Sequence, residues 1–416
     1  MDHPYLTSDL PGIGGRVRVD PEDFFVEEVP LYPALGIGEH LYVTIEKVGL
    51  TTYEAVGKLA RALGVKERDF GYAGLKDRRA VTRQVVSIRG VRAEAVLAVS
   101  APGLRVLSAK KHANKLRIGH LRGNRFRVTI RGLEVEAAVA STRAMAVLEV
   151  LSRRGVPNFF GEQRFGGRRD NHLVGKALIF HDPEAVVQRI VGEPEDATTY
   201  PALTEARRAY REGDAKAAVA LVPPRFSTER RVLRSLARRP DDFSSAVSAI
   251  GKNLLWLYVS AYQSWLFNRC LEQRLETLDL ILEGDLAYKH LNGSVFRVED
   301  VAAEQVRTDR FEISPSGPLF GSKMIRPEPG IEADIENAVE AEEGISPDLF
   351  DRVVPGVRPK GARRAFRFPL EDLQVREEGD HLEVSFFLPR GSYATAVLRE
   401  LMKVDTPELA EARIES

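Results

Sequence analysis

GYAGLKDRRAVTRQ, residues 71–84, is the most informative stretch of this chain and places one acid, Asp77, between Lys76 and the pair Arg78-Arg79. A lone carboxylate among cations is stabilised in its ionised form. An Asp in a glycine-rich segment more often closes a turn or caps a helix, and spacing alone favours that structural role. The stretch therefore predicts either a turn residue or an anion beside cations that can also hold a polyanion.

The order G-x-K-D-x-x-A-x-T-x-Q resembles the signature of the TruD family of tRNA pseudouridine synthases, in which the Asp is catalytic. The matching positions are filled without a gap by Gly74, Lys76, Asp77, Ala80, Thr82 and Gln84. Four more blocks resemble the family in the same order: PEDFFVEEVP (21–30), GNRFRVTIR (123–131), PNFFGEQRFG (157–166) and FFLPRGSYATAVLRELM (386–402). The length of the insertion and the form of the motifs resemble archaeal members.

The resemblance implies a catalytic domain interrupted by an insertion. We expect residues 1–161 and 369–416 to form a pseudouridine-synthase catalytic domain, an α+β fold with a mixed, mostly antiparallel sheet flanked by helices. Residues 162–368 are expected to form an inserted α/β TRUD domain. A chain of 416 residues also exceeds the roughly 250–300 at which a single core stops growing, which independently predicts two domains.

Periodicity agrees with this fold class. Alternating apolar residues predict strands at 15–28, 40–48, 83–88, 104–109, 115–120, 124–130 and 381–388. Helical spacing predicts helices at 51–65, with Thr51 or Thr52 as the cap, and at 134–153, 202–220, 228–238 and 392–402.

Several function classes are disfavoured. No apolar run reaches the roughly 18–20 residues of a membrane span, and the first residues lack a signal-peptide pattern, so we expect a cytoplasmic protein without a membrane partner. The single cysteine, Cys270, excludes an intrachain disulfide and lies in a helical apolar stretch, where a buried structural thiol is expected. The eight histidines show no ligand spacing, and neither a dinucleotide nor a P-loop motif is present, so we expect no metal and no cofactor.

Charge is uneven along the chain although the formal net charge is zero. Residues 95–133 contain nine cations and no acid, which predicts a local positive field for RNA phosphates. Arg153, Arg154, Arg164, Arg168 and Arg169 and the Arg-rich stretch 225–239 are further candidates, although each one singly is a typical solvated residue. The acidic run at 328–343 is most simply a solvated helix face or a loop.

One residue is the candidate for catalysis, and two are candidates for binding the base. Asp77 is the expected catalytic nucleophile or base, as the resemblance implies, and attack at C1′, attack at C6 and removal of a ribose proton all stay open. Phe126 is the expected platform for an extruded base, and the alternative is a core residue sharing a strand face with Val128. Asn124 shares that face and can pair with a uracil edge or orient the Asp, unless it only ends a turn after Gly123.

Three more residues are candidates for substrate binding. Arg18 precedes the first motif, where the family carries a basic residue, and either contacts a phosphate or Asp77 or lies on a solvated strand face. Phe24 matches the family's active-site aromatic, and one of Phe24 and Phe25 is expected to be core. Lys76 is expected to steady Asp77 or bind a phosphate, and Glu28 is a weaker candidate.

The expected function is isomerisation of a specific uridine in tRNA, uridine 13 of the D arm, to pseudouridine by a monomer with tRNA as its partner and no protein partner. One rival is a catalytically silent RNA-binding protein on the same scaffold. A second is a nuclease or glycosylase that cuts a bond with the same carboxylate and does not rejoin it.

Overall fold

The computed structural model describes residues 3–192, 201–351, 353–354 and 356–404. Packing divides the chain into two compact units. Pro4–Asn158 and the segment that begins at Arg367 form the first, named here the sheet unit, and Phe159–Phe366 with His3 form the second, the helical unit. In the part of the chain that is described, no helix is both long and apolar enough to cross a membrane.

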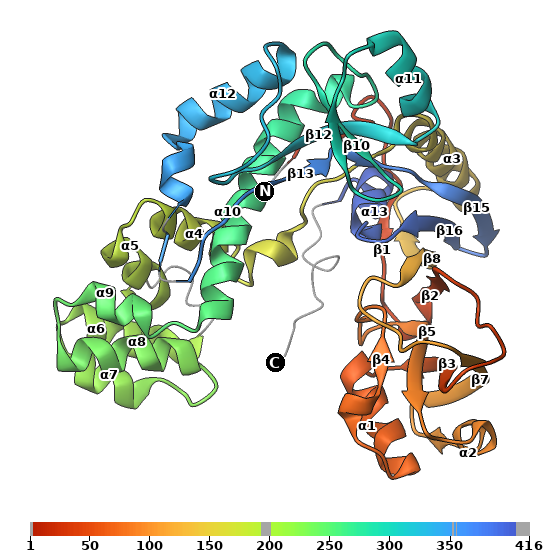
Figure 1. Ribbon diagram of the computed structural model, residues 1–416, viewed down its shortest axis with the longest axis horizontal. Coiled ribbons are helices and arrows are strands. Elements are labelled where there is room, and N and C mark those ends of the chain that lie inside the picture. The colour runs from red at the N-terminus through yellow and green to blue at the C-terminus, as the bar shows by residue number, and fades with distance from the viewer. Residues whose placement is uncertain (1–2, 193–200, 352, 355, 405–416) are drawn as a thin grey trace. The chain divides into compact units, whose positions relative to one another are not determined.

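One ten-stranded sheet organises the sheet unit (Figure 1). The elements in chain order are β1 Gly14–Arg16, η1 Pro21–Asp23, β2 Phe24–Pro30, β3 His40–Val48, α1 Thr52–Leu63, η2 Glu67–Asp69, β4 Gly71–Tyr72, β5 Val81–Arg89, α2 Ala93–Leu97, β6 Ser100–Ala101, β7 Leu104–His112, β8 Leu121–Leu133, α3 Ala137–Arg154, β9 Val156–Pro157, β14 Arg367–Phe368, β15 Glu371–Glu378, β16 His381–Pro389 and α13 Ala394–Met402. The strand order is β15-β16-β8-β2-β5-β3-β7-β6, with β1 beside β8 and β4 beside β5. Strands β2 and β5 pair in parallel and the other neighbours antiparallel, so the predicted mixed, mostly antiparallel sheet is confirmed.

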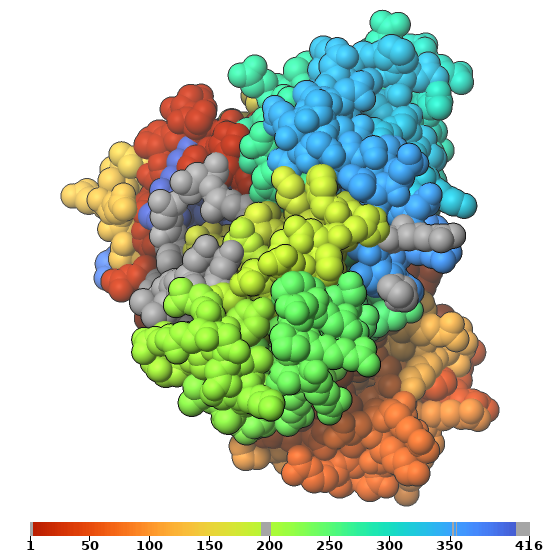
Figure 2. Space-filling view, turned by 90° about the vertical axis from the view of Figure 1, so that its left-hand side faces the viewer, coloured from red at the N-terminus to blue at the C-terminus, as the bar shows by residue number. Residues whose placement is uncertain are grey.

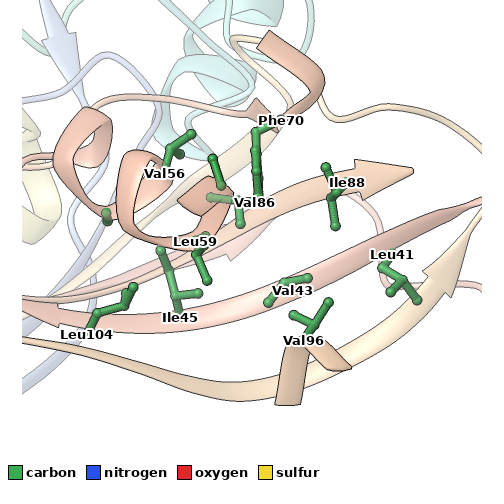
Figure 3. Packing of buried hydrophobic residues seen from close by; sticks show 12 residues of the cluster. Leu41, Val43, Ile45, Val56, Leu59, Phe70, Val86, Ile88, Val96 and Leu104 are labelled. Atoms are coloured by element: carbon green, nitrogen blue, oxygen red, sulfur yellow. The ribbon is translucent and has the colours of Figure 1, made fainter. Parts of the chain in front are cut away.

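Helix α1 covers the part of the sheet that leads into the Asp77 loop. Val56 and Leu59 on its inner face pack with Val43 and Ile45 of β3 in one buried cluster (Figure 3). As predicted, the helix is capped by Thr51, whose hydroxyl accepts a hydrogen bond from the Glu54 amide at 3.2 Å, while the Glu54 carboxylate accepts from the Thr51 amide at 2.7 Å. A cap of this kind contributes about 1 kcal/mol and fixes the residue at which the helix begins.

Two segments far apart in sequence, β8 and β16, pair near the β15 edge of this sheet. Strand β16, blue in Figure 1, lies along β8 from Leu382 opposite Ile130 to Pro389 opposite Gly123. A Cβ atom at Gly123 would collide with the Leu388 carbonyl oxygen, so this close approach requires glycine there. The GNRF motif therefore lies where the two parts of the sheet unit join.

The helical unit combines many helices with a smaller antiparallel sheet of order β11-β10-β12-β13. Its elements are η3 Glu162–Phe165, α4 Asn171–Ile179, α5 Pro183–Val187, the π-helical turn η4 Gln188–Gly192, η5 Pro201–Leu203, α6 Thr204–Arg211, α7 Ala215–Leu221, α8 Ser227–Arg238, α9 Phe243–Ser248, α10 Lys252–Arg274, η6 Leu275–Thr277, β10 Leu286–Lys289, β11 Val295–Arg297, α11 Val301–Asp309, β12 Ile313–Leu319, α12 Ile331–Glu343, η7 Pro347–Phe350 and β13 Ala362–Ala365. Cys270 of α10 is buried as expected, and burial raises the pKa of its thiol.

Three predicted elements are wrong. The strand predicted at 15–28 is two strands, β1 and β2, with the short 3₁₀ helix η1 between them. Residues 115–120 form no strand: the Leu116 amide donates to the Ser87 hydroxyl, and the chain turns through Gly119 at a φ of 89°. The helix predicted at 202–220 is two helices, α6 and α7, because the chain turns at Gly213, where φ is 87°, and Asp214 then caps α7. The errors at 115–120 and 202–220 arise at glycines whose left-handed backbone interrupts an otherwise suitable pattern.

Contrary to the prediction from the sequence, the acidic run at 328–343 is not wholly solvated, because two of its glutamates are buried. It forms α12, but Glu332 and Glu336, one helical turn apart, are each only 1% exposed. Glu336 pairs with the buried guanidinium of Arg363, which lies 3.5 Å from Glu332, while Arg274 and Asp285 form a second buried pair at 2.5 Å. Three carboxyl groups thus face two guanidinium groups. Burial, reinforced by the Glu336 charge, raises the pKa of Glu332 well above its ordinary value and favours its protonated form.

We therefore expect Glu332→Gln, which mimics the protonated acid, to change the free energy of unfolding at neutral pH by less than about 1 kcal/mol. Because the folded-state pKa of Glu332 is raised, the native chain loses stability as pH rises from the unfolded value toward the folded one, and the variant should lose less. Both tryptophans lie in α10, so urea unfolding followed by tryptophan fluorescence between pH 5 and 8 reports on this unit. Asp285→Asn, which removes a charge bonded to Arg274, is the control that should cost more; equal losses would contradict the assignment.

Candidate active site

The loop that carries Asp77 connects β4 to β5, and a buried lysine binds its backbone. Lys47 of β3 has a relative exposure of 0%, and its Nζ donates to the carbonyl oxygens of Leu50 at 2.5 Å, Lys76 at 3.3 Å and Asp77 at 2.8 Å. Burial lowers the pKa of Lys47 to about 8, although the Asp77 carboxylate opposes this shift. Sequence reasoning missed Lys47, because a lysine on a strand next to charged residues looks solvated.

Two further side chains fix the backbone on either side of Asp77. The Thr52 hydroxyl accepts from the Lys76 backbone amide at 2.9 Å and donates to the side-chain oxygen Oε1 of Gln84 at 2.9 Å. Gln84 Nε2 in turn donates to the Gly74 carbonyl oxygen at 3.3 Å. The Gln of the motif therefore ties the loop to the start of α1, which gives a physical reason for its place in the signature.

The Asp77 side chain is 46% exposed and has one ion-pair partner among the described residues. Arg18 Nη2 lies 3.0 Å from Asp77 Oδ2, and the Arg18 side chain is 9% exposed. Its guanidinium also lies 4.1 Å from the centre of the Phe24 ring, a cation–π contact. Of the roles considered for Arg18, the structure shows the contact with Asp77. The φ angle of Arg18 is 60°, a backbone conformation that residues other than glycine seldom adopt.

The sequence neighbours of Asp77 do not surround its carboxylate as expected. Lys76 is 7% exposed and its Nζ lies 2.9 Å from Glu28 Oε2 and donates to Asn124 Oδ1 at 2.9 Å. Arg78 donates to the Gly49 carbonyl oxygen at 3.1 Å. The Lys76 side chain therefore points inward, and the Asp77 carboxylate accepts a hydrogen bond from Arg18, which lies 59 residues earlier in the sequence. Glu28, the weakest sequence candidate, is a buried member of this network.

The aromatic candidates are more enclosed than the platform model requires. Phe126 is 7% exposed, with its ring centre 5.4 Å from Phe386 and 6.1 Å from Phe24. Phe24 is 2% exposed and Phe25 lies on the other face, where Arg83 and Arg127 approach its ring. Phe24 and Phe126 therefore belong to the core, and a stacking role for Phe126 stays a prediction.

About half of the cations in the segment 95–133 are paired with acids from other parts of the sheet unit. Five of its nine cations have carboxylate partners within 3.5 Å: Arg105 with Glu46, Arg122 with Glu371, Arg125 with Asp372, Arg127 with Glu383 and Arg131 with Asp23. The acids are absent from the segment but present across the sheet, which no local charge count detects. Among the described residues no group of three His, Cys, Asp or Glu side chains converges as metal ligands.

Comparisons with known proteins agree over almost the whole chain. The family model described as tRNA pseudouridine synthase D (TruD) matches residues 1–401. Curated proteins described as tRNA pseudouridine synthase D from Geobacter metallireducens and Geobacter sulfurreducens are each 50% identical over 404 residues, which are 97% of this chain and 98% and 97% of those proteins. A crystal structure described as a tRNA pseudouridine synthase D from Methanosarcina mazei has a TM-score of 0.86 and 31% identity, and the match covers 96% of each chain.

Proposed function

Since this chain belongs to the TruD family of tRNA pseudouridine synthases, we propose that it converts uridine 13 in the D arm of tRNA to pseudouridine, with Asp77 as its catalytic carboxylate. The enzyme class is an isomerase. The bond from ribose C1′ to uracil N1 breaks, a bond from C1′ to C5 forms, the C5 proton leaves, and N1 ends with a proton. Atoms and charges balance without an oxidant, a reductant or a phosphate donor.

The observation that carries the proposal is the geometry of Asp77. Its carboxylate is solvent-accessible on a loop whose backbone is held by hydrogen bonds to the buried side chains of Lys47 and Thr52, and the guanidinium of Arg18 binds the carboxylate. A reactive anion must be both reachable and fixed, because misplacement by about 1 Å can cost 10²-fold in rate. Arg18 orients the carboxylate, and the same side chain is stacked on Phe24, which restricts its movement.

We assign the uracil to the surface beside Asn124 and Phe126. The Asn124 carbonyl oxygen is already held by Lys76, which leaves its NH₂ group to donate to a uracil oxygen. Stacking on an aromatic ring contributes about 1–3 kcal/mol per base, and Phe126, which is 7% exposed, is assigned that contact. Lys76 is then a positioning residue for Asn124 rather than a phosphate ligand. We further propose that one chain acts alone, in the cytoplasm.

The test is pseudouridine mapping on an unmodified tRNA transcript incubated with the purified chain. We expect one pseudouridine, at position 13, with no free uracil and no shortened RNA. A transcript with cytidine at position 13 is the control and should gain none. Modification only at another position would overturn the target assignment, while released uracil or cut RNA would favour the glycosylase or nuclease.

A further inference from the structure

An arginine-lined pocket lies in the helical unit, on a surface that none of the motifs includes. Helices α8 and α9 lie side by side (Figure 1). Residues of both helices line an open pocket with a volume of about 360 Å³. Its lining comprises Arg231, Arg234, Arg238, Arg239 and Ser245 with two smaller contributors. In Figure 2 the green surface of these helices is open to the viewer.

The arginines form a stripe rather than a random scatter. Arg231, Arg234 and Arg238 are spaced three and four residues apart, which puts them on one face of α8. The seven residues from first to last rise about 10 Å along the helix. Opposite this stripe, Val232, Leu233 and Leu236 are buried, so the arginine face is directed outward by the packing of the helix.

The charges of this pocket are only slightly compensated. Arg239 pairs with Asp242 at 3.3 Å, and Arg231 donates to the Ser227 carbonyl oxygen and the Thr228 hydroxyl of its own helix. Arg234 and Arg238 are exposed and have no hydrogen-bond or ion-pair partner among the described residues. This contrasts with the strand cations of the sheet unit, most of which are paired with carboxylates.

We propose that this pocket binds consecutive phosphates of the tRNA backbone; the inference rests on the proposed function and adds a contact surface to it. A guanidinium presents donors in a planar fork that matches two phosphate oxygens. A stripe about 10 Å long spans more than one phosphate of a strand. Ser245 lines the pocket as well, but its hydroxyl already donates to Asp242 Oδ2 at 2.7 Å, so the arginines supply the phosphate contacts.

The test compares two charge-reversed variants in tRNA binding and pseudouridine formation. Arg234→Glu with Arg238→Glu alters the pocket, and Arg310→Glu with Lys323→Glu makes the same change of charge at exposed positions of the same unit outside it. The pocket variant should raise the Kd and the KM for tRNA at least about tenfold, while kcat at saturating tRNA stays within twofold. The slope of log K against log salt should become less steep by the amount that about two phosphate contacts contribute. The control pair should change Kd by less than about threefold.

The outcomes separate this inference from the proposed function. If the unaltered chain forms no pseudouridine, the proposed function fails. If it does, and the pocket variant binds tRNA with an unchanged Kd and salt slope, the pocket serves another ligand, such as an acidic protein surface, and the inference is overturned. Arg234→Lys with Arg238→Lys keeps the charge and should retain the salt slope, and circular dichroism of all variants reports whether they fold.

Discussion

Asp77→Asn is expected to form no detectable pseudouridine while binding tRNA as tightly as the unaltered chain. The amide has the same shape, and its oxygen can still accept from Arg18, so the loop and the tRNA surface should be unchanged. What is lost is the anion, and removal of a group that acts directly in the chemistry costs about 10⁴-fold or more in kcat. Single-turnover pseudouridine formation and tRNA filter binding, measured on the same preparations, check both halves of the prediction.

Asp372→Asn is a closely matched control. Asp372 is also an exposed aspartate of the sheet unit, paired with Arg125 at 3.1 Å, and its positive φ of 55° is as acceptable to Asn as to Asp. This variant should keep full activity. An Asp77→Asn enzyme that retains a tenth of the activity, or that loses binding and catalysis together, would remove Asp77 from the chemistry and revive the silent RNA-binding alternative.

Lys47→Met is expected to lower kcat by about 10²-fold with little change in tRNA affinity. Lys47 does not reach the surface, so it cannot contact tRNA, yet its three hydrogen bonds set the carbonyl groups of Leu50, Lys76 and Asp77. Methionine fills a similar volume without donors, so the loop should relax and the Asp77 carboxylate should shift. The readout is kcat against KM together with the pH profile of kcat.

The pH profile distinguishes a positioning role from general destabilisation. Burial lowers the pKa of Lys47 to about 8, so the ammonium with its three donors exists below that pH and one donor is lost above it. The kcat of the unaltered enzyme should therefore fall as pH rises through about 8, and the variant should lack this step. Lys58→Met also removes a lysine that donates to a backbone carbonyl, that of Pro102, and should leave kcat and its profile unchanged. A Lys47→Met enzyme with normal kcat would show that the loop needs no such support.

The features that could be predicted from the sequence are those that a pattern of nearby residues determines. Strand β3 and helix α1 follow from alternation, helical spacing and a threonine cap, each set by residues a few positions apart. The glycine-rich motif around Asp77 likewise predicts a loop at this point of the chain. Strand β15 was missed because its exposed, mostly charged residues show no apolar alternation, and its pairing partner β16 supplies the reason for its conformation.

The contacts that were missed depend on residues brought together only by the fold. Arg18 contacts Asp77 across 59 positions, and the acids that pair with five of the nine 95–133 cations lie outside that segment. The sequence predicts a solvated Glu332 because the cation beside which it is buried, Arg363, lies far away in sequence on β13. Composition gives the charges, but burial decides whether they form a surface field or an interior network.

The pairing of β8 with β16 also orders events on the ribosome. When the β8 segment emerges, the strand that must lie beside it has not been translated, and Phe386, which stacks on Phe126, is still missing. The nascent sheet therefore exposes an open edge of the kind that recruits other chains until the helical unit has been synthesised. The surface proposed for the uracil is therefore completed only after β16 has been translated, and nascent chains stalled before β16 are expected substrates for chaperones.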